Sequence, residues 1–145
     1  MSGFASIPLQ LGRILSVTRN LQQLDLRASA SALTDNVMRV ICCNLTQLTH
    51  LNVKGCHQLT SYGFLGPNHC TLDPSRPPVE NDFSDYVDTG QTIAGLKYLV
   101  NLNIGGLKIG DEVFEHFQFD DLRALNVSDN YSITSKGFKV RHYFY

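Results

Sequence analysis

The sequence predicts an α/β fold in which about four short repeats stack side by side, and three observations lead to this prediction. The first is a motif with apolar residues at offsets 0, 3 and 5, which occurs four times along the 145-residue chain. The second is its spacing, because the first leucines of successive motifs are separated by 27, 51 and 23 positions. The third is a segment with helical apolar spacing after the motif. The four first leucines are Leu21, Leu48, Leu99 and Leu122.

Each motif is typical of one short strand of a parallel sheet. In the second motif, Leu51 and Val53 alternate with polar residues, so both point to one side of the strand. The polar residues point to the other side: His50, Asn52 and Lys54. Cys56 stands where the chain leaves the strand, and a small polar or thiol side chain at that point can satisfy loop backbone groups.

The repeat length indicates the architecture. Two of the intervals lie within the range of about 20–29 residues that leucine-rich repeats show, and the third equals one repeat plus an insertion of about two dozen residues. One such unit cannot bury its apolar side alone, so the units must stack. The sequence therefore predicts a short leucine-rich-repeat solenoid of about four repeats, with a parallel concave sheet, a helical convex side and one inserted acidic loop.

The chain divides into three parts and one insertion. Residues 1–20 are expected to form an N-terminal helix, which is either a cap or a preceding partial repeat. Residues 21–138 form the repeat domain, with the inserted loop at 65–95. Residues 139–145 form a C-terminal tail.

Apolar spacing predicts the first helix. Within residues 5–20, Leu11, Ile14 and Leu15 recur at helical intervals, so this segment is expected to enter the first strand as a helix. An alternative is the opening helix of an F-box, which carries a similar pattern with Pro8. The segment is too short for a whole F-box, because the first strand begins near Leu21.

Two later segments predict helices on the convex side. Thr34 or Asp35 is the expected N-cap of the first of them. Its inward side consists of Val37, Met38 and Ile41. The corresponding segment of the third repeat begins at Asp111 and carries Val113, Phe114 and Phe117.

The insertion at 65–95 breaks the repeat pattern. Its first half contains four prolines, which end helices and favour turns. Its second half carries four carboxylates: Glu80, Asp82, Asp85 and Asp88. A long loop of this kind is either disordered or functional, and both a disordered loop and a partner-binding loop remain open at this point.

Composition excludes several classes of function. The net charge is −1, from 12 basic and 13 acidic residues, so nothing indicates binding to nucleic acid or to a membrane surface. No run of about 18 apolar residues predicts a membrane span. The first residues lack the pattern of a secretory signal, and the adjacent Cys42 and Cys43 suit reduced thiols better than a disulfide framework. We therefore expect a cytoplasmic or nuclear protein.

Residues capable of catalysis or metal binding lack the required spacing. Cys56 and His57 are adjacent, and no cysteine or histidine pair has the separation that zinc sites use. Gly105 and Gly106 follow a strand but lack the rest of a phosphate-binding loop. We predict no enzymatic activity, no metal and no cofactor.

The stacked strands are expected to form a partner-binding face. Their outward residues would align in three columns across the sheet, and solenoids use such extended surfaces for binding. The expected contact residues are Gln23, Asp25, Arg27, His50, Asn52, Lys54, Asn101, Asn103, Asn126 and Ser128. Arg27 and Lys54 make one end of this face basic, which favours an acidic partner or the chain's own acidic loop.

Residues 41–60, ICCNLTQLTHLNVKGCHQLT, resemble the cysteine-containing leucine-rich repeat. This repeat occurs in F-box/leucine-rich-repeat substrate receptors of cullin-RING ubiquitin ligases and in antagonist-of-mitotic-exit-network proteins. The resemblance covers about 100 residues and is most evident at 21–64 and 122–138. It implies a protein-interaction module that recognises substrates for a cullin-RING ubiquitin ligase, with ligase subunits as partners.

The sequence also departs from that pattern, since no F-box is visible. Cys56 is the only cysteine at a strand exit, where the other repeats have Ser29, Leu107 and Asn130. Leu107 cannot bond to backbone groups through its side chain, so we expect an irregular third turn. The alternative to an interaction module is an incomplete or truncated structural repeat fragment with no ligand of its own.

Overall fold

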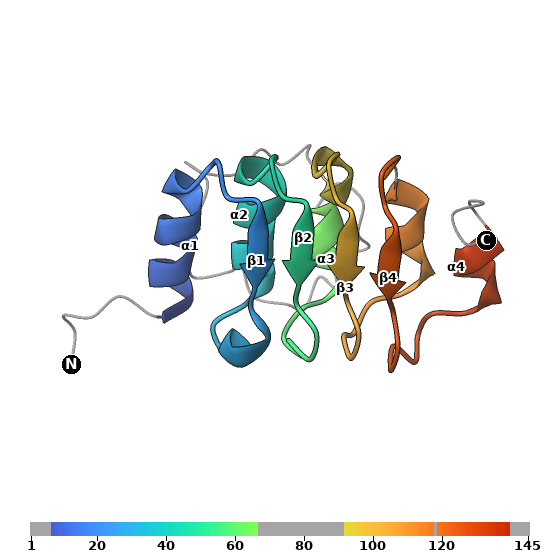
Figure 1. The fold of residues 1–145 in the computed structure, drawn as a ribbon. Helices are drawn as coiled ribbons and strands as arrows, with labels where there is room; N and C mark the ends of the chain where they lie inside the picture. The colour runs from blue at the N-terminus through green and yellow to red at the C-terminus, as the bar shows by residue number, and fades with distance from the viewer. Residues whose placement is uncertain (1–6, 67–91, 118, 140–145) are drawn as a thin grey trace.

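The computed structural model describes residues 7–66, 92–117 and 119–139 and has an α/β architecture. Four short strands form one parallel sheet in the order β1-β2-β3-β4 (Figure 1). The strands are β1 (Gln23–Asp25), β2 (His50–Asn52), β3 (Asn101–Asn103) and β4 (Ala124–Asn126). The spatial order of the strands is therefore their order in the sequence.

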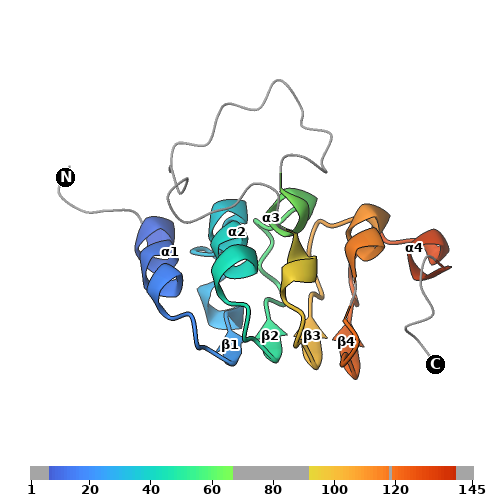
Figure 2. The ribbon, with the colours of Figure 1, turned by 90° about the horizontal axis from the view of Figure 1, so that it is seen from above.

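Helices cover one face of this sheet. The α-helices are α1 (Ile7–Val17), α2 (Asp35–Asn44), α3 (Ser61–Leu65) and α4 (Ser135–Lys139). Short 3-10 helices, labelled η, are η1 (Arg27–Ser29), η2 (Ile93–Gly95) and η3 (Asp111–His116). Figure 2 shows the four α-helices on the same side of the strands, where they spread more widely than the strands do. None of the described helices is long and apolar enough to cross a membrane.

The inward leucines lie in one row across the sheet, as the sequence predicts. Leu24, Leu51, Leu102 and Leu125 are paired in register between neighbouring strands. Leu51 and Leu102 are 1% and 0% exposed, whereas the two leucines of the outer strands are only partly buried. An outer strand has one neighbour instead of two, which explains this difference.

The helix predicted after the first strand is confirmed as α2. Thr34 is the N-cap of α2, and its side chain accepts a hydrogen bond from the Val37 amide at 3.5 Å. The inward residues Val37, Met38 and Ile41 are all 0% exposed. Such a cap satisfies one of the amides that a helix start leaves without an intrahelical partner.

In the third repeat, the corresponding segment forms the 3-10 helix η3 and not an α-helix. Its N-cap is Gly110, which provides no side-chain hydrogen bond. Val113, Phe114 and Phe117 are buried as predicted. The Phe117 ring also contacts Phe119, with 5.0 Å between ring centroids, so the aromatic cluster continues toward β4.

Helix α1 forms where it was predicted, but its inward face differs from the prediction. Leu15 is buried, whereas Ile14 is 57% exposed. The buried stripe runs through Gly12, Leu15 and Ser16, and Leu11 is partly buried beside it. Two of these three buried residues are small, and α1 packs against α2. The spacing of large apolar residues does not predict a stripe of this composition.

The third turn is regular, contrary to the expectation from Leu107. The residue two positions after each of the last three strand motifs has a left-handed backbone: Gly55, Gly106 and Asp129, with φ of 74°, 67° and 59°. The Leu107 amide donates to Asn130 Oδ1 of the next repeat at 2.9 Å. A neighbouring side chain thus supplies the partner that a leucine cannot offer.

Paired side chains connect successive repeats on the helical side. Asp35 accepts hydrogen bonds from the Thr60 amide at 2.8 Å and from the Thr60 hydroxyl at 2.6 Å. Asp111 accepts the same two bonds from Thr134. A glycine three positions after each threonine makes room, because a Cβ at Gly63 would lie 2.7 Å from Asp35 Oδ1. These contacts are here called the Asp–Thr clamps.

The boundaries of the insertion are narrower than predicted. Leu65 ends α3 and is fully buried, and Ile93 begins η2 and is also fully buried. Both residues belong to the packed core and not to a surface loop. The rest of the predicted acidic loop, residues 67–91, lies outside the described residues, as do residues 1–6 and 140–145.

The alternation along β3 can be tested with one inward and one outward substitution. Leu102→Asp places a carboxylate in the core without a partner, which should cost several kcal/mol and unfold the chain. Asn103→Asp should fold normally, because Asp25 already occupies the same position in β1. Urea denaturation followed by circular dichroism measures both. Equal midpoints for the two variants would contradict the strand register.

The Asp111 clamp should make stability depend on pH. The hydrogen bonds from Thr134 lower the pKa of Asp111 below its ordinary value of 3.8, because they favour the carboxylate. This stabilisation is fully present above the unfolded-state value and is lost as the pH falls through the lower folded-state value. Asp111→Asn should therefore lower the free energy of unfolding measured by urea denaturation at neutral pH, by no more than about 1 kcal/mol for a solvent-accessible group.

The same comparison in acid provides the control. Once the wild-type carboxyl group is protonated, the difference between wild type and Asp111→Asn should shrink. A difference that stays constant from neutral pH into this acid range would mean that the charge of Asp111 contributes nothing to the clamp.

Candidate functional site

The candidate site is the face of the sheet that no described helix covers, here called the open face. It consists of the outward residues of the four strands: Gln23, Asp25, His50, Asn52, Asn101, Asn103, Ala124 and Asn126. The pairing of the strands places these residues in two columns, as the sequence predicts. Every neighbour within a column is separated by one strand spacing, about 4.8 Å.

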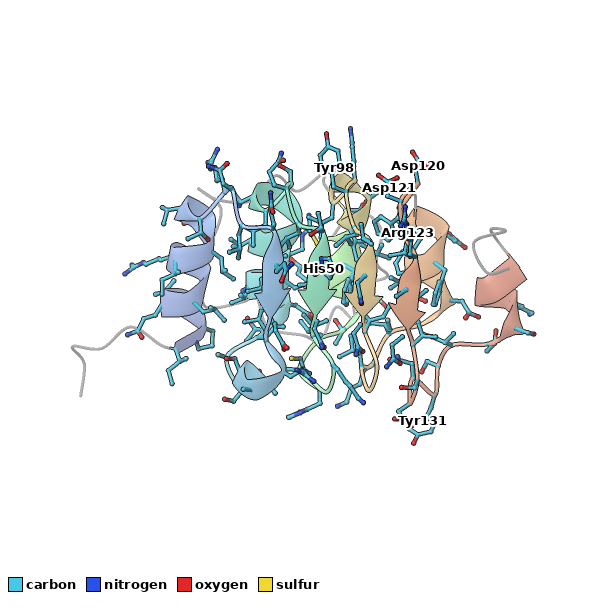
Figure 3. All side chains as sticks on the ribbon, in the orientation of Figure 1. His50, Tyr98, Asp120, Asp121, Arg123 and Tyr131 are labelled. Carbon is cyan, nitrogen blue, oxygen red and sulfur yellow. The ribbon has the colours of Figure 1, made fainter. Side chains whose placement is uncertain are left out.

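The first column crosses the sheet near the start of each strand. It contains Gln23, His50, Asn101 and Ala124, and all four side chains are exposed. Figure 3 shows His50 in the middle of the open face, with Tyr98, Asp120 and Asp121 at the edge where the strands begin. The column therefore offers two amides and one imidazole to solvent.

The second column has a structural role that the sequence analysis missed. Asn52 Oδ1 accepts a hydrogen bond from the Lys54 amide at 3.1 Å. Asn103 Oδ1 accepts one from the Gly105 amide at 3.1 Å, and Asn126 Oδ1 accepts one from Ser128 at 2.9 Å. Each side chain thus satisfies the first amide of its own turn. The signal is present in the sequence, because asparagine and aspartate are typical of this bond to the backbone two residues on.

Asp25 performs the same task in β1 and also binds Arg27. Its Oδ1 accepts from the Arg27 amide at 3.1 Å, and the two side chains form an ion pair at 2.7 Å. The side-chain hydrogen bond from Arg27 holds the pKa of Asp25 below its ordinary value. Arg27 therefore pairs with an acidic residue two positions earlier, and its predicted role in anchoring an acidic partner together with Lys54 stays a prediction.

The third predicted column of side chains is interrupted at β3. Lys54 and Ser128 are exposed, but Gly105 between them is buried and has no side chain. The Ser128 hydroxyl donates to Asn126 Oδ1 at 2.7 Å, so it reinforces the turn after β4. Lys54 is the cation of this column that makes no ion pair with any described residue.

A shallow hollow lies over the first three strands. Its volume is about 310 Å³, and it is lined by Gln23, Leu24, Asp25, His50, Leu51, Asn52 and Asn101. Its polar side chains come from the two columns, and Leu24 and Leu51 of the strands complete the lining. The hollow thus brings together five of the ten residues that the sequence analysis assigned to partner binding.

The orientation of the His50 ring follows from its neighbour. The Thr49 hydroxyl lies 3.1 Å from the Gln22 carbonyl oxygen, to which it donates its only proton. Thr49 Oγ1 is also 2.9 Å from His50 Nδ1, so the threonine hydroxyl fixes the orientation of the ring.

The buried cysteines are structural. Burial raises the pKa of Cys42 to about 12 and that of Cys56 to about 11, so neither is a thiolate at neutral pH. Cys56 Sγ lies 3.5 Å from the Leu26 carbonyl oxygen of the preceding repeat, which fits the predicted role of this residue at the strand exit. Among the described residues, no group of three side chains is arranged to hold a metal ion.

The chain was compared with protein-family models, with curated proteins and with solved structures, and none of them matches it.

Proposed function

We propose that this chain is a non-catalytic protein-interaction module that binds a protein partner on its open face. The observation that carries the proposal is the pair of side-chain columns, one exposed and one partly exposed, in which the strand register holds neighbours one strand spacing apart. The side chains that meet in the hollow are amides, one imidazole and a carboxylate that Arg27 already pairs. This set suits recognition of hydrogen-bonding groups on another molecule.

In this proposal the fold is a leucine-rich-repeat solenoid with the open face as its concave side. Three regularities support it. The inward leucines share one register, and a left-handed residue follows the last three strands at the same offset. The Asp–Thr clamps recur between the first and second repeats and between the third and fourth. Stacked units of this kind create extended binding surfaces.

The proposed place of the module is substrate recognition in a cullin-RING ubiquitin ligase in the cytoplasm or nucleus. This part rests on the resemblance of residues 41–60 to the cysteine-containing repeat. The feature that supports it here is Cys56, which bonds the preceding repeat from the strand exit. In such an assembly the open face would hold the substrate, while other surfaces would contact ligase subunits.

A second candidate is a structural repeat segment with no ligand of its own. One observation favours it: helix α1 exposes Ile7, Ile14 and Val17, at 66%, 57% and 77%, along one side. An apolar stripe of this kind is typical of a helix that packs against another element. This candidate predicts self-association through α1 and no partner on the open face.

Site-specific photocrosslinking in cells tests the proposal. A photoreactive residue at position 101, in the hollow, should trap a defined protein that mass spectrometry identifies and that rebinds the purified chain. The matched control carries the same residue at Glu115, which is exposed on η3 on the helical side. The control should not trap that protein.

Three outcomes separate the candidates. A trapped substrate together with cullin-ligase subunits supports the full proposal, and a trapped protein without ligase subunits removes only the ubiquitin part. If position 101 traps nothing and the purified chain self-associates until Ile14→Gln makes it monomeric, the second candidate is correct and the interaction module is wrong.

A further inference from the structure

The three asparagines of the second column have fixed amide orientations. A backbone amide can only donate, so the atom that accepts from Lys54, Gly105 or Ser128 must be the side-chain oxygen. In each case the other terminal atom is Nδ2, with two N–H groups. The turns therefore use the oxygen of each side-chain amide, and the Nδ2 group takes no part in them.

These Nδ2 groups form a row of donors across β2, β3 and β4. None of the three makes a hydrogen bond from Nδ2 within the described part of the chain, and all three residues remain partly exposed. The row is Asn52, Asn103 and Asn126, with one strand spacing between neighbours. A ligand that lies across the strands and offers acceptor atoms at this spacing would satisfy it.

One cation and one carboxylate follow the strands of the row. Lys54 follows β2 and is exposed without an ion pair to any described residue, and Asp129, which is also exposed, follows β4. Asp25, the carboxylate of the second column, is already paired with Arg27. The acidic pair Asp120 and Asp121 lies at the opposite edge, as Figure 3 shows. A carboxylate ligand therefore meets donors along the row and one cation, Lys54, at its β2 end.

The spacing of the row distinguishes between two kinds of ligand. Two strand spacings amount to about 9.6 Å. Residues i and i+7 of an α-helix are about 10.5 Å apart along its axis. In an extended strand, three successive side chains on one face belong to residues i, i+2 and i+4, and the first and third are about 13.6 Å apart. A helix therefore fits three successive amides to within about 1 Å, and an extended peptide does not.

We propose that the open face binds the acidic side of a partner α-helix that lies across the strands. Asn52, Asn103 and Asn126 donate from Nδ2 to carboxylates at positions i, i+3 or i+4, and i+7 of that helix, and Lys54 adds charge attraction. This inference rests on the proposed function, because it specifies the partner of the same surface.

The probe is a designed alanine-rich helical peptide of about 20 residues with glutamates at i, i+4 and i+7. Titration into the uniformly labelled protein should shift the side-chain amide NMR signals of Asn52, Asn103 and Asn126. Asn44 is the internal reference, because its Nδ2 already donates to the Val40 carbonyl at 3.1 Å on α2. Its signal should stay unchanged.

Two peptide controls define the ligand. One has lysine in place of each glutamate, and the other has the same composition with glutamates at i, i+1 and i+6, no two of which are three, four or seven positions apart, so they are spread around the helix. Both should bind at least tenfold more weakly. Equal binding of the lysine peptide would overturn the acidic assignment, and equal binding of the spread peptide would overturn the helical one.

A pair of variants in β3 isolates the donor. Asn103→Asp keeps the oxygen that the Gly105 amide needs but removes the N–H donor, so it should fold normally and weaken peptide binding by tenfold or more. Asn101→Asp adds the same charge in the first column of the same strand and removes no donor of the row. It should weaken binding only about two- to threefold, in a manner that added salt suppresses.

The results also separate this inference from the proposed function. Equal weakening by both variants would mean that charge alone, and not the donor row, determines binding. If no helical peptide binds while crosslinking at position 101 still traps a partner, the donor-row inference is wrong and the interaction module stands.

Discussion

The whole structure depends on the register of three-residue strands in one parallel sheet. A strand of this length has one inward side chain, and an isolated strand cannot keep it from water. Only the alignment of Leu24, Leu51, Leu102 and Leu125 turns four such side chains into a continuous apolar row under the helices. The helices on one side of the sheet and the open face on the other are both positioned by this row.

The register itself is maintained where the chain leaves each strand. An asparagine or aspartate oxygen binds the amide two residues later, and a left-handed residue follows in three of the four turns. Side chains then bridge to the preceding repeat, as Cys56 does to Leu26 and Asn130 does to Ile104, where Nδ2 lies 2.7 Å from the carbonyl oxygen. Fold and candidate site therefore share the same residues.

This sharing has a functional consequence. An asparagine has an acceptor end and a donor end, and the turns of β2, β3 and β4 use only the acceptor. The fold thereby holds three donors at a fixed spacing without any loop that has to become ordered on binding. Binding to such a preorganised surface avoids part of the entropy cost of association. In β1 the equivalent residue is Asp25, whose carboxylate has no N–H donor and forms an ion pair with Arg27. The row of donors therefore ends at β2.

The sequence by itself determined the α/β class, the four strands, their inward leucines, and the buried residues of the helical segments after the first and third strands. These depend on short-range periodicity, which a chain displays residue by residue. Tertiary structure decided the rest. The exposure of Ile14, the regular third turn despite Leu107, and the pairing of Arg27 with Asp25 each depend on a neighbouring element or on side-chain geometry that spacing does not encode. The donor row belongs to the same group, because the direction of an amide is fixed by the backbone group that it meets in space.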